Sequence, residues 1–156
     1  AAARVPESKY EMIDLSDFEM PIYSEDRESE QGVPELAFKF KKLLKESDGI
    51  IISFAEHNGV YTAAFKNILD WISVIENLVW CNKPMFLLAT SNGARGAKTV
   101  LEIAHARISL ENTNQIPIFS LPKYNENFDQ VKGITNAELL NKFEHSLEIF
   151  IKNLYK

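Results

Sequence analysis

The stretch SFAEHNGVYTAAFKNILDW (Ser53–Trp71) follows a short apolar run, turns at an Asn-Gly pair and then takes up the spacing of a helix. Gly59 allows a positive φ angle, or lets a ligand approach the backbone closely. Asn58 tolerates the left-handed region and can hydrogen-bond within its own turn. A strand, a polar turn and a helix in succession form a typical ligand-binding segment. An ordinary Asn-Gly turn is the alternative interpretation.

Three nearly continuous apolar runs resemble strands that are covered on both faces, as in a parallel sheet. They are Gly49–Phe54, Lys83–Ser91 and Gln115–Leu121. A fourth segment, Tyr10–Leu15, alternates between apolar and polar residues and is also predicted to be a strand. The polar, proline-containing residues 16–34 are predicted to form a long loop.

Helical spacing of apolar residues separates and follows these strands. The predicted helices are Pro34–Ser47, Thr62–Leu78, Thr99–Asn112 and a closing helix from Thr135 to Lys156, capped by Thr135 or Asn136. Strict alternation of strands and helices predicts an α/β fold, a doubly wound parallel sheet with helices on both faces. No internal repeat or second domain is visible, so residues 1–156 are predicted to form a single domain.

The chain begins with AAARVP rather than with Met, and these residues resemble the end of a helix. In a doubly wound sheet of order 2-1-3-4-5, a strand lying inside the sheet would precede that helix. We therefore expect that this sequence lacks one strand, one loop and most of one helix at its N-terminus. A genuine four-stranded sheet behind a tag remnant is the alternative.

Composition narrows the class of protein. The net charge of −5 argues against nucleic-acid binding, which requires clustered Lys and Arg. A single cysteine, Cys81, excludes a disulfide framework and a cysteine-based metal site, and favours a cytoplasmic location. No apolar run approaches the roughly 20 residues that span a bilayer, so no membrane partner is expected.

Ligands of open α/β sheets bind beyond the carboxyl ends of the strands. Besides the Asn-Gly turn, the segment Ser91–Lys98 occupies such a position, and its glycines Gly93 and Gly96 allow close approach. Free amides at the following helix start attract electron-rich atoms. The segment does not match the phosphate-loop pattern, because Ala97 stands where that pattern needs Gly. Neither metal-ligand spacing nor a nucleophilic Ser elbow occurs, so no metal site and no catalytic side chain are predicted.

The segment AEHNGVYTAAFKNILDW resembles a motif of the NADPH-dependent FMN reductase family, flavodoxin-like proteins that include azoreductases, quinone reductases and chromate reductases. The family pattern is Pro-Glu-Tyr-Asn-Gly, about five variable residues, then Leu-Lys-Asn-x-x-Asp-Trp. Seven positions match in place and spacing: Glu56, Asn58, Gly59, Lys66, Asn67, Asp70 and Trp71. The Ser-x-Gly-x-x-Gly turn at Ser91–Gly96 adds to a resemblance that covers about residues 10–110.

Three substitutions depart from the family pattern: Ala55 replaces Pro, His57 replaces Tyr, and Ala97 replaces the second Gly of a pair. The family's first loop, rich in Ser and Arg, holds the FMN phosphate and has no counterpart in this sequence. Phosphate anchoring is therefore assigned to no residue.

The resemblance implies a flavodoxin-like, FMN-dependent oxidoreductase that passes electrons from NADPH or NADH to a small acceptor. The acceptor would be a quinone, an azo compound, a metal oxyanion or free flavin. The resemblance also implies a homodimer or homotetramer, with Lys66, Asn67, Asp70 and Trp71 on the helix and dimer face, and Trp71 at the oligomer interface. The implied cofactor-binding residues are Ala55, Glu56, His57, Asn58, Gly59, Ser91, Asn92, Gly93, Arg95 and Gly96.

Two other functions remain open at this point. A flavodoxin-type electron carrier would exchange electrons with proteins and would not oxidise NADPH. A non-catalytic interaction domain would keep the fold and lose the cofactor, in line with Ala55, His57 and the absent phosphate loop.

Overall fold

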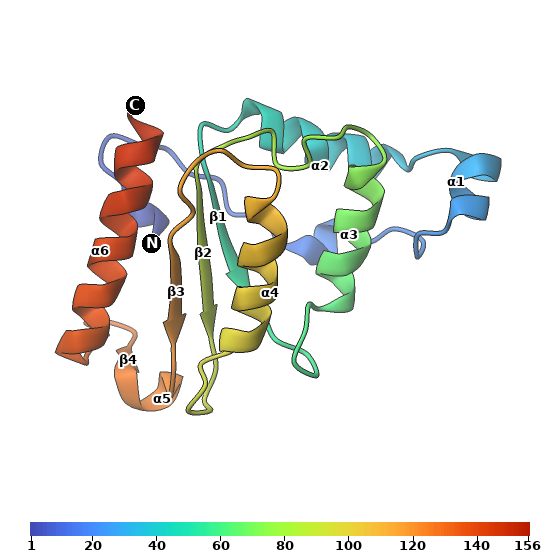
Figure 1. Cartoon of the computed structure of the whole chain (residues 1–156). Helices are drawn as coiled ribbons and strands as arrows, with labels where there is room; N and C mark the ends of the chain where they lie inside the picture. The colour runs from blue at the N-terminus through green and yellow to red at the C-terminus, as the bar shows by residue number, and fades with distance from the viewer.

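The computed structural model describes residues Ala1–Lys156 and has a parallel sheet of three strands in the order β1-β2-β3. The strands are β1 (Ile50–Phe54), β2 (Met85–Thr90) and β3 (Ile118–Leu121). All three run in the same direction, so their carboxyl ends share the lower edge in Figure 1. The three apolar runs predicted to be buried parallel strands are therefore confirmed.

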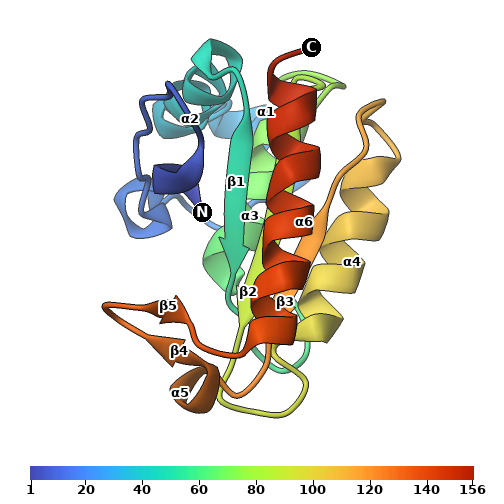
Figure 2. The same ribbon diagram turned by 90° about the vertical axis from the view of Figure 1, so that its left-hand side faces the viewer.

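Helices cover both faces of this sheet, as the alternating pattern predicted (Figures 1 and 2). On one face lie α3 (Ala63–Ser73) and α4 (Lys98–Ser109), with α2 (Glu35–Glu46) packed beside α3. On the other face lies α6 (Ala137–Leu154). The Asn136 side chain caps α6 by accepting a hydrogen bond from the Leu139 N–H at 3.0 Å, one of the two predicted caps.

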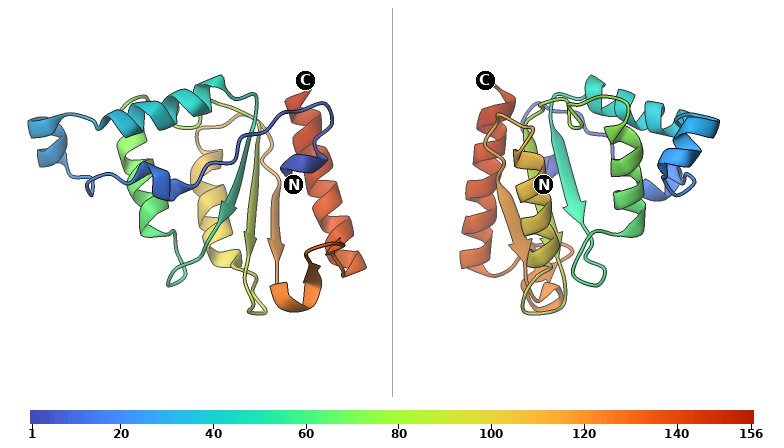
Figure 3. Two further views of the ribbon diagram at one scale, coloured as in Figure 1. Left: turned by 180° about the vertical axis from the view of Figure 1, so that it is seen from behind. Right: turned by 45° about the vertical axis from the view of Figure 1, so that its right-hand side comes forward.

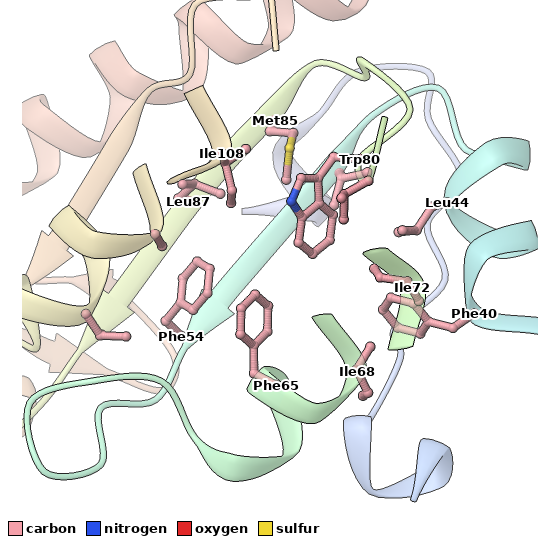
Figure 4. Packing of buried hydrophobic residues seen from close by; sticks show 14 of the residues in the cluster. Phe40, Leu44, Phe54, Phe65, Ile68, Ile72, Trp80, Met85, Leu87 and Ile108 are labelled. Carbon is pink, nitrogen blue, oxygen red and sulfur yellow. The ribbon is translucent and has the colours of Figure 1, made fainter. Parts of the chain in front are cut away.

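Alternate side chains of each strand enter two separate cores. In β2, Met85, Leu87 and Ala89 join the core beneath α3 and α4, whereas Phe86 joins the core beneath α6. Figure 4 shows the first core, where Phe54 and Phe65 meet edge to face with ring centroids 4.9 Å apart. Because both faces are buried, the strands carry continuous rather than alternating apolar sequence.

The N-terminal third departs from the sequence predictions. Tyr10–Leu15 is not a strand, and the sheet therefore has three strands rather than four. An extended segment becomes a strand only by pairing with a neighbour, and this one pairs with none. Figure 3 shows it crossing behind the sheet, from the side of α6 to the side of α3.

The predicted loop at residues 16–34 contains two short helices. They are the 3₁₀ helix η2 (Leu15–Phe18) and α1 (Glu25–Gln31). Ser24 caps α1 by accepting from the Arg27 N–H at 3.2 Å, and acidic residues in the first turn complement the helix dipole. This polar segment forms a helix through its local caps rather than through burial, since none of its residues is buried.

Helix α3 ends at Ser73, five residues before the predicted end at Leu78. The buried Lys41 of α2 holds the segment that follows, because its Nζ donates to the carbonyls of Leu78 at 2.6 Å and Val79 at 2.7 Å. Those carbonyls are thereby held by another helix. The chain turns there so that Val79 and Trp80 enter the core.

The remaining elements are short. The first residues form a 3₁₀ turn, η1 (Ala2–Arg4), and Arg4 pairs with Glu144 of α6 at 2.7 Å. After β3 come α5 (Tyr124–Asn127) and an antiparallel pair, β4 (Phe128–Asp129) and β5 (Gly133–Ile134). None of the helices combines the length and apolarity needed to cross a bilayer.

Candidate functional site

The Asn-Gly turn lies directly beyond the carboxyl end of β1. His57 and Val60 close it with two backbone hydrogen bonds, each 3.1 Å long. Asn58 and Gly59 both have positive φ angles, 53° and 82°, as the sequence predicted for this pair. Nothing lies within 4 Å of the position that a Cβ on Gly59 would occupy. Gly59 is therefore required by backbone conformation and not by packing inside the protein.

The second loop, Ser91–Gly96, follows β2 at the same edge of the sheet. Its last residue is buried, with φ +59°. A Cβ on Gly96 would lie 2.5 Å from the Ser120 Oγ and 2.6 Å from the backbone nitrogen of Pro122. Gly96 thus lets the loop pack closely against the end of β3. Arg95 is exposed, and its guanidinium donates to the Thr99 Oγ1 at 2.6 Å.

Ala97 occupies the N-cap position of α4 in the left-handed region, with φ 57° and ψ 35°. This conformation costs a residue with a Cβ roughly 1 kcal/mol or more. The structure thereby explains why the family pattern places Gly where this chain has Ala. Ala97 also offers no side-chain acceptor to the first N–H groups of α4.

Glu56 supplies the acceptor that Ala97 lacks. Its Oε2 accepts a hydrogen bond from the Val100 N–H at 2.9 Å, across 44 residues of sequence. The carboxylate is half-buried between the two loops. The segment after β1 is therefore fastened to the helix that follows β2.

A third segment at this edge was not among the sequence-predicted candidates. The N–H groups of Lys123 and Tyr124, directly after β3, donate to the carbonyls of Gly93 and Ser91, both at 3.0 Å. The rule that ligands bind beyond strand ends applies equally to β3 and could have identified this segment. Three consecutive loops, rather than two, form the edge.

Asn67 and Trp71, two residues of the Lys-Asn-x-x-Asp-Trp motif, bind the backbone of the Met20–Tyr23 segment. The Asn67 amide accepts from the Tyr23 N–H at 2.9 Å and donates to the Met20 carbonyl at 3.0 Å. The Trp71 indole donates to the Pro21 carbonyl at 2.7 Å, and its side chain is completely buried. The prediction that Trp71 lies at an oligomer interface is therefore wrong, because its ring is enclosed within the chain.

Lys66 and Asp70, the other motif residues on α3, pair at 2.6 Å on the surface. They line a groove of about 310 Å³ between α3 and α4. The groove shares Ser73 and Arg107 with a cleft of about 640 Å³ at the opposite edge of the sheet. The cleft lies away from the three strand-end loops, whereas the groove reaches the first of them at Tyr61.

Tyr61 is the titratable residue of the first loop with a clear pKa shift. Burial raises the pKa of its phenol above the ordinary value of 10.0, and its ring packs 4.9 Å from that of Phe65. Tyr61 packs against the core beneath α3 and α4. His57 is exposed on the turn, His105 is half-buried on α4 and His145 is exposed on α6.

Comparison with known proteins shows the family to which this chain belongs. The sequence profile described as NADPH-dependent FMN reductase matches residues 1–127, and the chain belongs to that family. An NADPH azoreductase from Bacillus sp. (strain OY1-2) is 34% identical over 107 residues, which are 69% of this chain and 57% of the relative. A 2-hydroxy-1,4-benzoquinone reductase from Burkholderia sp. is 37% identical over 89 residues, 56% of this chain and 46% of the relative.

Among solved structures, FerB from Paracoccus denitrificans, a flavoenzyme NAD(P)H:(acceptor) oxidoreductase, superimposes with a TM-score of 0.70 at 19% identity. The match covers 94% of this chain and 80% of FerB. The resemblance and the flavodoxin-like α/β fold predicted from sequence are confirmed. The chain spans about half the length of the curated relatives that it matches.

Proposed function

We propose that this protein is an FMN-dependent NAD(P)H oxidoreductase that passes electrons to a small acceptor. The observation that carries the proposal is the edge formed by the three strand-end loops. There the Asn-Gly turn of the family motif is fastened through Glu56 to α4, beside the Ser91–Gly96 turn. The relatives named azoreductase and quinone reductase support a quinone or azo compound as acceptor. Metal oxyanions and free flavin are further candidates.

The residues present fit a flat cofactor at this edge. Ala55, His57 and Asn58 are exposed, and the space next to the Gly59 Cα is open. In the proposal, Ala55–Gly59 line the ribityl chain and one edge of the ring, largely through backbone groups. His57 stands near the ring and the nicotinamide pocket, where its imidazole can stack or donate.

The Ser91–Gly96 turn meets the other side of the ring in this proposal. Asn92, Gly93 and Arg95 are exposed there and Ser91 is half-buried, whereas Gly96 is buried. Gly96 therefore contributes by setting the path of the loop. Bound FMN supplies the redox chemistry by accepting hydride from NADPH or NADH, and the chain supplies orientation and electrostatics. No side chain is assigned as acid or base, and no residue is assigned to the phosphate.

We also propose that residues 1–156 act as one flavodoxin-like domain and assemble into a homodimer or homotetramer. The groove between α3 and α4 and the adjoining cleft are the candidate interface, because Ile103 in the groove is 38% exposed and Leu110 in the cleft is 79% exposed. Lys66 and Asp70 remain candidate interface residues. The single, half-buried Cys81 supports a cytoplasmic location.

The test is the visible absorption spectrum of the full-length protein with FMN, before and after anaerobic addition of NADPH. We expect a bound-flavin spectrum that bleaches on reduction. A flavin spectrum that persists with both NADPH and NADH would instead identify an electron carrier. Absence of binding with excess FMN would reject both redox functions and leave a non-catalytic interaction domain. Sedimentation analysis of the same sample tests the assembly separately.

A further inference from the structure

Helix α4 begins without a cap of its own. The N-cap residues of α3 and α6, Thr62 and Asn136, each accept a hydrogen bond from an N–H in the first turn of their own helix. At the same position α4 has Ala97, whose methyl group accepts none. The corresponding N–H, that of Val100, is bound by Glu56 from the loop after β1. The cap of α4 is therefore supplied by the other predicted binding loop.

We propose that Glu56 is a positioning residue, whose carboxylate fixes the spacing between the Asn-Gly turn and the Ser91–Gly96 turn so that FMN fits between them. The inference rests on the proposed function for its ligand. Backbone and hydroxyl hydrogen bonds from three residues, Lys123, Tyr124 and Ser120, already hold the Ser91–Gly96 turn to the end of β3. Glu56 adds the one side-chain hydrogen bond between the Asn-Gly turn and α4. Loss of that hydrogen bond should detach the Asn-Gly turn from α4 and leave the Ser91–Gly96 turn in place.

The hydrogen bond from the Val100 N–H to Glu56 also places a negative charge at the N-terminus of α4. A carboxylate at a helix N-terminus is favoured by the helix dipole and by the unpaired N–H groups there. Because the negative group is part of the chain, it compensates the positive helix end before any ligand arrives. Glu56 therefore acts through the backbone of α4 and not as a direct ligand, while its own backbone remains free to line the cofactor.

Three variants distinguish a role of Glu56 in positioning the two loops from a role in stabilising α4 alone. Glu56→Ala removes the acceptor. Glu56→Gln keeps an oxygen acceptor for the Val100 N–H and removes the charge. Asn136→Ala removes a side-chain cap at the equivalent position of α6, where the bound N–H is that of Leu139. Because this cap connects neither of the two loops, the variant serves as the matched control. All three are compared with the wild-type full-length protein.

The first measurement is the dissociation constant of FMN from fluorescence quenching. Glu56→Ala should weaken binding about tenfold, within the range typical of coupling between linked groups. Glu56→Gln should restore affinity to within about threefold of wild type, because the amide oxygen still binds Val100. Asn136→Ala should leave affinity unchanged. Wild-type affinity in Glu56→Ala, or equal losses in the Ala and Gln variants, would overturn the inference.

The second measurement needs no cofactor and separates failure of the inference from failure of the proposed function. In Glu56→Ala, the Val100 amide should exchange hydrogen faster, and the amide signals of Asn58 and Gly59 should shift. Asn136→Ala should change neither. If wild type binds no FMN but these signals change as expected, the loop coupling stands and the FMN proposal fails. Unchanged signals of Asn58 and Gly59 in Glu56→Ala would overturn the positioning role regardless of flavin.

Discussion

Gly96 and Gly59 both have positive φ angles, +59° and +82°, but their surroundings differ. An added Cβ meets nothing at Gly59, whereas at Gly96 it would lie 2.5 to 2.8 Å from Ser120 and Pro122. Left-handed backbone costs an Ala roughly 1 to 2 kcal/mol at either site. Reduced freedom of the unfolded chain returns roughly 0.4 to 1 kcal/mol. Overpacking adds roughly 1 to 3 kcal/mol at Gly96 alone.

We therefore expect Gly59→Ala to lower the free energy of unfolding by about 1 kcal/mol or less. Gly96→Ala should lower it by about 2 kcal/mol more, because two of its three close contacts are backbone atoms of Pro122 that cannot rotate away. For a chain of this size that difference corresponds to roughly 4 to 8 °C in melting temperature.

The assay is urea denaturation and thermal unfolding without flavin, followed by tryptophan fluorescence and circular dichroism. Ser120→Ala in the Gly96→Ala background removes the contact at 2.5 Å and leaves those to Pro122, so it should restore only part of the stability. Equal losses in Gly59→Ala and Gly96→Ala would refute the reasoning from close packing. Full rescue by Ser120→Ala would show that the backbone contact carries no cost.

Three further predictions concern the elements that hold the N-terminal half. Lys41→Met should lower the free energy of unfolding by about 2 to 4 kcal/mol, because the buried carbonyl of Val79 and the part-buried carbonyl of Leu78 lose their donor. A loss below about 0.5 kcal/mol in urea denaturation would contradict this. Asn67→Ala should speed hydrogen exchange at the Tyr23 amide, whereas its neighbour variant Lys66→Ala should not. The hydrogen bond from Lys45, the largest cause, holds the pKa of Glu76 below its ordinary 4.5, so its stabilising effect is present at neutral pH and lost as pH falls through that depressed pKa. Stability measured from pH 7 down to acid should therefore fall less steeply in Glu76→Gln than in wild type.

The parts of the fold that sequence predicted well are those set by local chemistry. The strands Ile50–Phe54 and Met85–Thr90 follow from unbroken apolar runs, and the Asn58-Gly59 turn follows from two residues that accept positive φ. The prediction of a strand at Tyr10–Leu15 was wrong, because alternation of polar and apolar residues indicates an exposed and a buried face but does not provide a partner strand. Pairing is decided by residues far away in the chain.

The contacts near the site that sequence did not reveal have the same origin. Lys41 holds the segment that follows α3, and it precedes that helix by more than 20 residues, so no pattern within α3 signals the contact. Glu56 is a predicted cofactor-binding residue, and nothing in its neighbouring sequence shows that its carboxylate also binds the Val100 N–H. The enclosure of Trp71 likewise depends on the Met20–Tyr23 segment. Side-chain contacts across tens of residues become visible only once the chain is folded.

The burial of Trp71 and the hydrogen bonds of Asn67 affect what the family motif can diagnose. Both side chains fasten the Met20–Tyr23 segment to α3 through hydrogen bonds to its backbone. A descendant of this scaffold that had lost every redox activity would still need them in order to fold. Detection of Lys-Asn-x-x-Asp-Trp in a new sequence thus reports inherited architecture. Whether such a descendant remains an enzyme is better judged from the residues around the Asn-Gly turn.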